Sequence, residues 1–288
     1  MVFRTPQTAQ APDELDYLSL PDASVLFDGV PDHLEIPLRA WLASALSTQG
    51  LVYDVRNDTP SARHVALRLR LTVTKPPYYL AVANVARNDL LRAVNATLQI
   101  AQLGSPLLHD LVETLEHAGS AYMLDTTSLQ LVRRVNEVAV KSKNATVRIA
   151  GRDGAGHLQE AWVSAYGLDP DPDQAYDEAV RSVEATICPI VSPNADGRRT
   201  LGTAISALKN DLGANRPKWE LALPDSSGTP ASIESLIQML DLLWRGQLSR
   251  HAGSTKSRRQ TQLEAEAAVH LAVLLVQWLR SGVLRPRQ

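Results

Sequence analysis

Arg245 and His251 are the two residues of this chain whose types and spacing best suit a chemical role. Five residues separate them, at the end of a segment with helical apolar spacing. Histidine can take up or release a proton near neutral pH, because its ordinary pKa is about 6.5. Arginine stays charged and presents a planar fork of donors that suits a phosphate. Cleavage of RNA without a metal needs both functions. The pair is therefore a candidate catalytic site, with His251 as acid or base and Arg245 as the phosphate stabiliser.

The segment around this pair carries a positive charge that the chain as a whole lacks. The formal net charge is -2, so no general attraction to nucleic acid is expected. No acidic residue occurs between Asp241 and Glu264, which leaves the basic residues of this interval unopposed. Solvated charges that only add solubility are the alternative interpretation. We predict RNA-phosphate contacts at four of these residues: Arg250, Lys256, Arg258 and Arg259.

The spacing of the pair sets a geometric condition on catalysis. Six positions along an ideal helix turn through about 600°, which leaves the two side chains about 120° apart. They can converge if the helix loosens towards Gly253, or if two copies of the chain build one composite site across a two-fold axis. A homodimer that forms through the C-terminal region is thus one of the two ways in which the pair can build a site. The alternative is that Arg245 is a surface residue and His251 interacts with the last carbonyls of the helix.

The C-terminal part of the chain has the apolar spacing of helices throughout. The Asp-Pro-Asp-Pro sequence at residues 169–172 is the clearest boundary signal, because proline interrupts a helix and Asp171 can cap the next one. Four apolar stripes follow, and Thr261 with Glu264 forms a capping-box sequence before the last of them. The pattern predicts a four-helix domain over residues 168–288.

The preceding residues predict a less uniform structure. We expect an extended arm at residues 1–30 and a regulatory or sensor domain at residues 31–167, which is either mixed α/β or mostly helical. Helical spacing occurs in four segments of this domain: 34–47, 88–103, 107–117 and 157–166.

Other segments of this domain are harder to assign. Alternating apolar residues predict a strand at residues 63–74. Arg68 and Arg70 would lie on its other side, where a solvated face is favoured over a binding surface. The glycines of residues 151–156 indicate a turn. Three segments leave alternatives open, a strand or a helix for 121–124 and 129–135 and a polar break or a helix end for 141–144.

Several classes of function are disfavoured by the composition. The single cysteine, Cys188, excludes a disulfide within one chain and indicates a core residue. The histidines outside the candidate site show no metal-ligand spacing, so we expect neither a metal nor a cofactor. The longest apolar run, residues 269–279, is too short to cross a bilayer, and the first residues lack the apolar core of a signal peptide. We expect a cytoplasmic protein without a membrane partner.

The Arg245-to-His251 spacing resembles the arginine–histidine motif of HEPN ribonucleases. Three further segments are similar to the C-terminal HEPN module of bacterial abortive-infection proteins: 175–184, 200–205 and 250–253. Residues 157–162 resemble the segment that leads into that module, and the resemblance covers roughly residues 155–285. It implies a mainly α fold with a C-terminal HEPN-like four-helix bundle.

The resemblance also implies a function. It points to a metal-independent endoribonuclease that dimerises and acts as a toxin or antiphage effector, with a protein trigger or inhibitor acting on the N-terminal domain. Active members often carry a polar residue directly after the motif arginine, where this chain has Gly246. The alternative is therefore a catalytically inactive HEPN-like module for dimerisation or for binding RNA or a nucleotide, as an adaptor in a defence system. A pure interaction protein is the third possibility.

Two acidic residues of the first C-terminal helix bear on this site. Glu178 or Glu184 can pair with the motif arginine, but a surface salt bridge or a solvated helix face is the favoured interpretation. Tyr176 on the same helix is expected to be a core residue rather than a catalytic one. These expectations place the chemistry at the end of the third C-terminal helix and leave the first helix a structural role.

Overall fold

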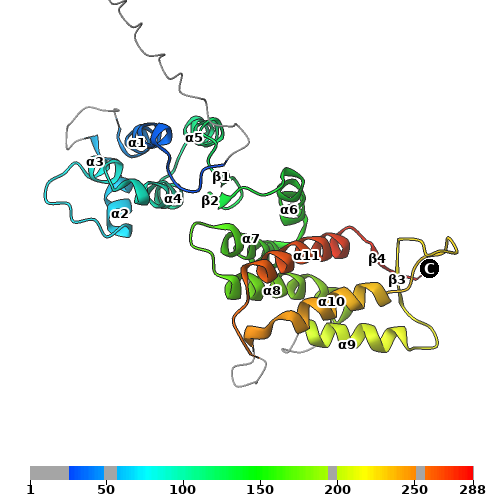
Figure 1. The fold of residues 1–288 in the computed structure, drawn as a ribbon. Coiled ribbons are helices and arrows are strands. Elements are labelled where there is room, and N and C mark those ends of the chain that lie inside the picture. The colour runs from blue at the N-terminus through cyan, green and yellow to red at the C-terminus, as the bar shows by residue number, and fades with distance from the viewer. Residues whose placement is uncertain (1–25, 49–56, 194–199, 251–256, 288) are drawn as a thin grey trace, which may run out of the picture.

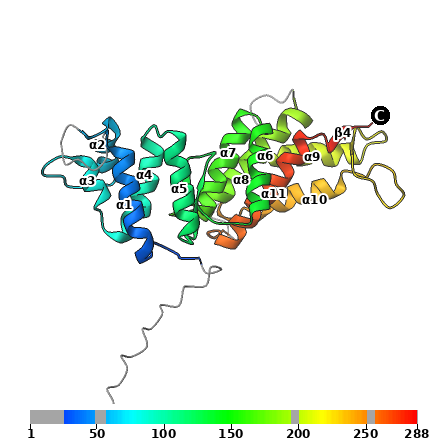
Figure 2. The same ribbon diagram turned by 90° about the horizontal axis from the view of Figure 1, so that it is seen from above.

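The computed structural model describes residues 26–48, 57–193, 200–250 and 257–287. Most of these residues are helical, and their buried apolar side chains form two hydrophobic cores. Helices α1 to α5 surround the first core, and helices α7 to α11 surround the second (Figure 1). The two groups lie next to each other along the length of the molecule (Figure 2). The mainly helical fold class is confirmed.

The first core is a cluster of short helices. Helix α1 packs against α3, α4 and α5, and α2 packs against α3 and α4. The helical predictions for this part of the chain are confirmed with small changes at the ends. The bounds are Asp32–Leu46 for α1, Pro60–Arg68 for α2, Tyr78–Ala83 for α3, Leu90–Ile100 for α4 and Ser105–His117 for α5.

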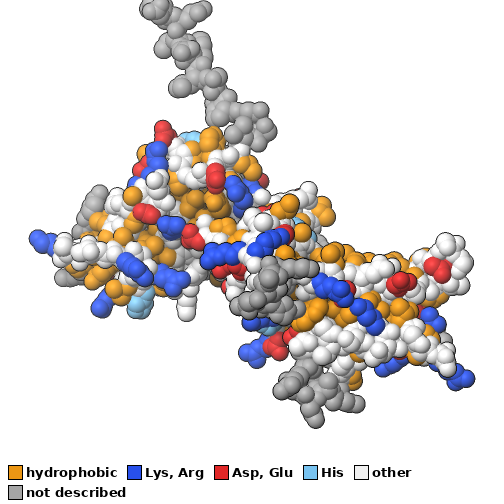
Figure 3. Space-filling view, turned by 60° about the horizontal axis from the view of Figure 1, so that its bottom comes forward, with side chains coloured by type: hydrophobic (Ala, Val, Ile, Leu, Met, Phe, Trp, Pro, Cys, Tyr) orange, Lys and Arg blue, Asp and Glu red, His pale blue; other side chains and the backbone are white. Residues whose placement is uncertain are grey.

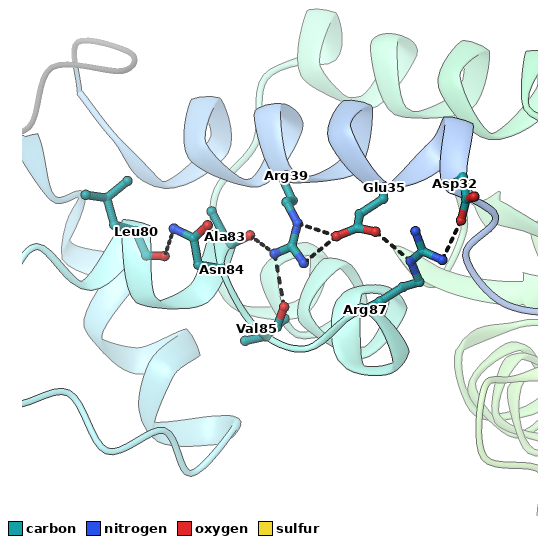
Figure 4. Close-up of polar contacts among 8 residues, drawn as sticks. All are labelled: Asp32, Glu35, Arg39, Leu80, Ala83, Asn84, Val85 and Arg87. Atoms are coloured by element: carbon teal, nitrogen blue, oxygen red, sulfur yellow. Dashed lines mark hydrogen bonds and ion pairs between the residues drawn. The ribbon is translucent and has the colours of Figure 1, made fainter.

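An arginine on α1 fixes this helix to the end of α3 (Figure 4). Arg39 donates through Nη1 to the carbonyl oxygens of Ala83 at 2.7 Å and Val85 at 3.0 Å. The same guanidinium holds Glu35 one turn earlier, at 2.8 Å. Hydrogen bonds from Arg39 and then from Arg87 lower the pKa of the Glu35 carboxyl. The carbonyls that end α3 therefore have a charged donor in place of a further helical turn.

The predicted strand at residues 63–74 is wrong, because its first half forms α2. Ala62, Val65 and Ala66 are buried together on one helical face, whereas Leu67 is 60% exposed. Alternation of apolar residues over this short stretch also contains the three-and-four spacing of a helix. Tertiary packing of that face decides between the two patterns.

A β-hairpin lies between the cores and shows that the two segments left open, 121–124 and 129–135, contain strands. Strand β1, Tyr122–Asp125, pairs antiparallel with β2, Gln130–Arg133. Residues 141–144 are neither a break nor a helix end, because α6 runs through them as Glu137–Ile149. Lys143 in this stretch is fully buried in an ion pair with Asp125, which explains how a polar segment continues a packed helix.

The predicted turn at residues 151–156 is also wrong, since α7 begins inside it and spans Arg152–Tyr166. Gly154 is buried where α7 crosses α8. A Cβ atom at this position would lie 2.9 Å from the Thr186 Oγ1 atom. The glycine therefore allows the two helices to approach closely, and it does not mark a chain reversal.

The second core is a helical bundle in which α8 is central. It packs against α7, α9 and α11, and α9 packs against α10. A two-stranded antiparallel sheet closes one end of the bundle. The predicted helices are confirmed, with bounds of Pro172–Val191 for α8, Leu201–Leu212 for α9, Glu234–Gly246 for α10 and Gln262–Arg280 for α11, and the strands are Trp219–Leu221 for β3 and Leu284–Pro286 for β4.

Local capping signals lie at the ends of these helices, and the Asp171 cap and the Thr261–Glu264 capping box are those that the sequence predicts. The Asp171 carboxylate accepts from the backbone N–H of Gln174 at the start of α8. Thr261 and Glu264 form a reciprocal capping box at the start of α11. Gly282, with φ 78°, follows the end of that helix in the left-handed conformation.

The two cores divide the chain earlier than residue 168. Leu158 and Trp162 of α7 are buried in the second core, and α6 packs against α7 and α11. The Asp-Pro sequence at residues 169–172 is thus the junction of two helices that share this core. Among the described residues, no helix combines the length and apolar character needed to cross a membrane.

Candidate functional site

Arg245 lies in the last turn of α10, with 72% of its side chain exposed. Its Nε atom donates to Asp241 Oδ2, one turn earlier, at 2.8 Å. Lys209 of α9 approaches the other oxygen of Asp241 at 3.5 Å. Exposed ion pairs of this kind contribute about 0–1 kcal/mol. An anion that offers two oxygens to Arg245 can therefore compete with Asp241 for the guanidinium.

The other predicted site residues divide into three groups. His251 and Lys256 lie outside the described residues, and so does the side chain of Arg250. Arg259 is exposed just before α11. Arg258 forms a two-pronged ion pair with Glu264, in which Nη1 donates to Oε2 at 2.8 Å.

The Arg258 ion pair belongs to the start of α11. Hydrogen bonds from Arg258 and from the Thr261 backbone lower the pKa of Glu264 to about 2. Within the described chain, no hydrogen bond or ion pair joins Arg258 or Arg259 to Arg245. Figure 3 likewise shows basic side chains in separate groups among acidic and apolar ones on the face it presents. Arg258 is held as part of a helix cap, whereas Arg245 and Arg259 extend into solvent.

Both ends of the segment between α10 and α11 are fixed to the first turns of α8. Gln247 is buried, and its Nε2 atom donates to Asp177 Oδ1 at 2.8 Å. At the other end, the backbone N–H of Gln260 donates to Asp173 Oδ1 at 2.8 Å. The Gln260 side chain then donates to the carbonyl of Gly246 at 3.0 Å. The residues on either side of His251 are thus set in place by two carboxylates of one helix.

Gly246, which follows Arg245 directly, has a packing explanation. A Cβ atom at this position would overlap the hydroxyl oxygen of Tyr176. That hydroxyl donates to the carbonyl of Leu243 at 3.1 Å, and burial raises its pKa to about 12. Tyr176 is a core residue, as expected, and it occupies the space that a larger residue after Arg245 would need.

A second polar cluster, between α7 and α8, was not predicted. His157 Nδ1 lies 2.6 Å from Glu178 Oε2, and only 7% of the Glu178 side chain is exposed. Gln174 Nε2 also donates to this carboxylate, at 3.0 Å. The interpretation of Glu178 as a surface residue or a partner of the motif arginine is therefore wrong. The available signal was its position on the apolar stripe of α8, next to Ala179.

A chain of contacts joins this cluster to the end of α10. Asp177, which accepts from Gln247, also binds Arg181 Nη2 at 2.8 Å. Arg181 Nη1 lies 3.4 Å from Glu178 Oε1, and Glu178 binds His157. A pocket of about 360 Å³ opens beside His157 and Arg181. The end of α10 and this pocket therefore share one polar network along α8.

Cys188 lies on the wall of the same pocket and is buried, as the sequence predicts. Its thiol donates to the carbonyl of Thr200 at 3.7 Å. Glu184 on the same helix accepts from the backbone N–H of Leu201 at 2.7 Å, which leaves it part of the α9 start. Neither residue contacts Arg245 through a hydrogen bond or ion pair in the described structure.

An apolar opening lies between α10 and α11. It has a volume of about 360 Å³ and is lined chiefly by leucine and alanine side chains of α10 and α11. Leu242 at its edge is 68% exposed, and the Tyr176 ring forms part of its wall. Such an exposed apolar surface beside Arg245 is typical of a protein–protein contact.

Comparisons of this chain with known protein families, with curated proteins and with solved structures each returned no match. In the described residues, no group of three or more His, Cys, Asp and Glu side chains is arranged to hold a metal ion. The resemblance to HEPN ribonucleases and the roles of Arg245 and His251 therefore remain predictions.

Proposed function

We propose that this protein is a metal-independent endoribonuclease of the HEPN type, with Arg245 and His251 as its catalytic residues. The observation that carries the proposal is the setting of Arg245. Its guanidinium is exposed at the end of α10 and pairs weakly with Asp241 in the described structure. Gln247 and Gln260 anchor both ends of the segment that contains His251. Anchored ends reduce the entropy lost when a loop positions a catalytic side chain.

In the proposed reaction, the His251 imidazole takes the proton of the ribose 2′-hydroxyl or gives a proton to the departing oxygen. Arg245 exchanges Asp241 for the phosphate and stabilises the charge that develops on its oxygens. The RNA backbone is attracted by the positive charges of Arg250, Lys256 and Arg259. Arg258 also contacts the RNA phosphates while it stays paired with Glu264. No step requires a metal or a cofactor.

We further propose that the active form is a homodimer built through the C-terminal helices. The apolar opening between α10 and α11 and the exposed Leu242 support this, because burial of such a surface favours association. Two copies can bring two Arg245–His251 pairs to one cleft. In the cell the enzyme would act in the cytoplasm as a toxin or antiphage effector, with a protein trigger or inhibitor on its N-terminal helices.

The test is cleavage of a labelled RNA by the full-length protein in excess EDTA. We expect cleavage by the wild type, and its loss in His251→Ala and in Arg245→Ala. His109→Ala is the matched control, because His109 is 72% exposed and lies on α5, far in the sequence from His251. Cleavage that persists in His251→Ala, or that disappears equally in His109→Ala, would refute the assignment.

The second candidate is a catalytically inactive module that binds RNA or a nucleotide as a defence-system adaptor. The packing of Tyr176 against Gly246 favours it, because no polar helper can stand next to Arg245. It predicts RNA binding by the wild type without cleavage. Such binding should weaken steeply as salt is raised, because it depends on phosphate contacts. Binding that ignores salt would instead indicate a pure protein-interaction role.

A further inference from the structure

Helix α2 ends in a motif that normally contains glycine. The backbone N–H of Leu71 donates to the carbonyl of Ala66, and that of Arg70 to the carbonyl of Leu67, both at 3.0 Å. This pair of bonds is the Schellman motif, whose penultimate residue adopts the left-handed conformation. Arg70 occupies that position with φ 55°. Arginine is less favourable than glycine in the left-handed conformation. The turn therefore does not explain why this position carries an arginine.

Arg70 lines one of two adjoining pockets at the end of α2. One, of about 320 Å³, extends towards the end of α3, and the other, of about 250 Å³, extends towards the linker before α8. Arg68, Leu69 and Arg92 line both pockets. The C-terminal end of α2 therefore projects arginines over a divided cavity whose other walls are α4 and the linker.

The charges of this site favour an anion. In the described chain, Arg68 and Arg70 are exposed and take part in no ion pair. Arg92 Nη2 binds Asp169 Oδ1 at 2.8 Å, and Nη1 lies 4.0 Å from Asp89. Three guanidinium groups thus face two carboxylates. Guanidinium forks suit phosphate oxygens, and a phosphate can displace Asp169 from an exposed pair.

The uncharged walls indicate what the anion is attached to. Leu69 lines both pockets, Leu71 lines the first and Ala96 the second. On the α4 side, Asn95 Oδ1 accepts from the Leu131 backbone N–H at 2.8 Å and Gln99 Nε2 donates to Gln130 Oε1 at 3.0 Å, so each amide has its other polar atom to offer. Apolar walls suit the face of an aromatic ring, and amides suit its polar edge.

We propose that this site binds a small nucleotide, with the phosphates on Arg68, Arg70 and Arg92 and the base against the apolar walls. The site lies at the end of α2, beside α4 and the linker before α8, whereas α10 packs in the second core (Figure 1). Its occupation does not depend on ribonuclease activity. A long RNA strand fits less well, because Asp89 and Asp169 flank the arginines and repel a continuous row of phosphates.

Binding of ADP and GDP to the full-length protein, measured by calorimetry, tests the proposal. We expect Arg68→Gln and Arg70→Gln each to weaken binding about tenfold or more, because each removes charged hydrogen bonds to phosphate. Arg63→Gln is the matched control. It removes the same charge from the same helix at an exposed position that lines neither pocket, so affinity should stay within about twofold.

A variant with the opposite expected effect separates binding from damage to the fold. Asp169→Asn removes the carboxylate that competes for Arg92 and should tighten binding about two- to fivefold, the range that corresponds to an exposed ion pair. Circular dichroism confirms that each variant is folded. The proposal is overturned if folded wild type binds neither nucleotide at millimolar concentration. It is equally overturned if Arg63→Gln weakens binding as much as Arg68→Gln does, or if only an RNA oligonucleotide binds through these arginines.

Discussion

The buried ion pair between Asp125 and Lys143 gives a sharp test of how the two cores are joined. Asp125 ends β1 of the hairpin, and Lys143 lies on α6, which packs against the second core. The Lys143 Nζ atom donates to both carboxylate oxygens at 2.9 Å and to Thr127 Oγ1 at 2.8 Å. The side chains are 0% and 3% exposed. Lys143→Met keeps the apolar stem but leaves the carboxylate buried without its cation.

Removal of one partner from a buried pair destabilises a protein by about 3–5 kcal/mol, because the remaining charge stays desolvated. We expect this loss for Lys143→Met. The double variant, Asp125→Asn with Lys143→Met, should lose less stability than the sum of the two single variants, since Asp125→Asn removes the charge that Lys143→Met leaves unpaired. Lys141→Met is the control. Lys141 lies on the same helix, is 71% exposed and pairs with Glu137 one turn earlier, so its loss should stay below about 1 kcal/mol.

Urea unfolding followed by circular dichroism and tryptophan fluorescence measures these differences. Lys143 also lies 5.4 Å from the ring centre of Trp162, so fluorescence reports on the site itself. Equal unfolding midpoints for Lys143→Met and Lys141→Met would refute the reasoning. So would a double variant, Asp125→Asn with Lys143→Met, whose loss equals the sum of the single losses.

The pH dependence of stability has a definite sign at this pair. Burial would raise the pKa of Asp125, but the Lys143 ammonium and the hydrogen bonds from Thr127 and Ser128 hold it below its ordinary value. A lowered carboxyl pKa contributes stability above the ordinary pKa of about 3.9, and that stability is lost as the pH falls through the folded-state value. The difference between wild type and Asp125→Asn should therefore shrink below about pH 4.

Three further predictions follow from particular contacts. Gly246→Ala should destabilise the protein by about 1–3 kcal/mol through overpacking, and by less when Tyr176→Phe removes the clashing hydroxyl, as thermal unfolding can measure. Arg70→Gly should stabilise the protein by about 1 kcal/mol, because glycine adopts the left-handed conformation freely; a lower melting temperature would contradict this. The carboxyl NMR signal of Glu264 should titrate near pH 2, and in Arg258→Gln it should move up towards the ordinary glutamate value.

The parts of the fold that depend on near neighbours are predictable from the sequence. The cap of α8 at Asp171 and the capping box of Thr261 and Glu264 involve residues at most three positions apart. Their side chains satisfy backbone groups of their own helix, so the local sequence is sufficient. The exposure of Arg245 follows in the same way, from its place at the end of an amphipathic helix.

The wrong predictions concern residues whose environment is set by distant parts of the chain. Residues 141–144 resemble a polar break or a helix end until the hairpin brings Asp125 to Lys143, eighteen positions away. Gly154 looks like a turn residue until α8 places Thr186 against it. Arg70 ends a helix without the usual glycine, so its segment carries no stop signal. In each case tertiary contacts override a local preference that is correct in isolation.

The candidate site also combines local and distant determinants. The exposure of Arg245 follows from its own helix, whereas the ends of the segment that contains His251 are positioned by α8. Asp173 and Asp177 hold the two ends of the segment that contains His251. The next residue, Glu178, holds His157. A helical turn thus points consecutive carboxylates towards two different neighbours, α10 on one side and α7 on the other. Any movement of α8 along its axis must shift both anchors together, because the carboxylates belong to one rigid helix. The geometry of the proposed catalytic pair is therefore coupled to the packing of α7 on α8, although α7 contributes no predicted catalytic residue.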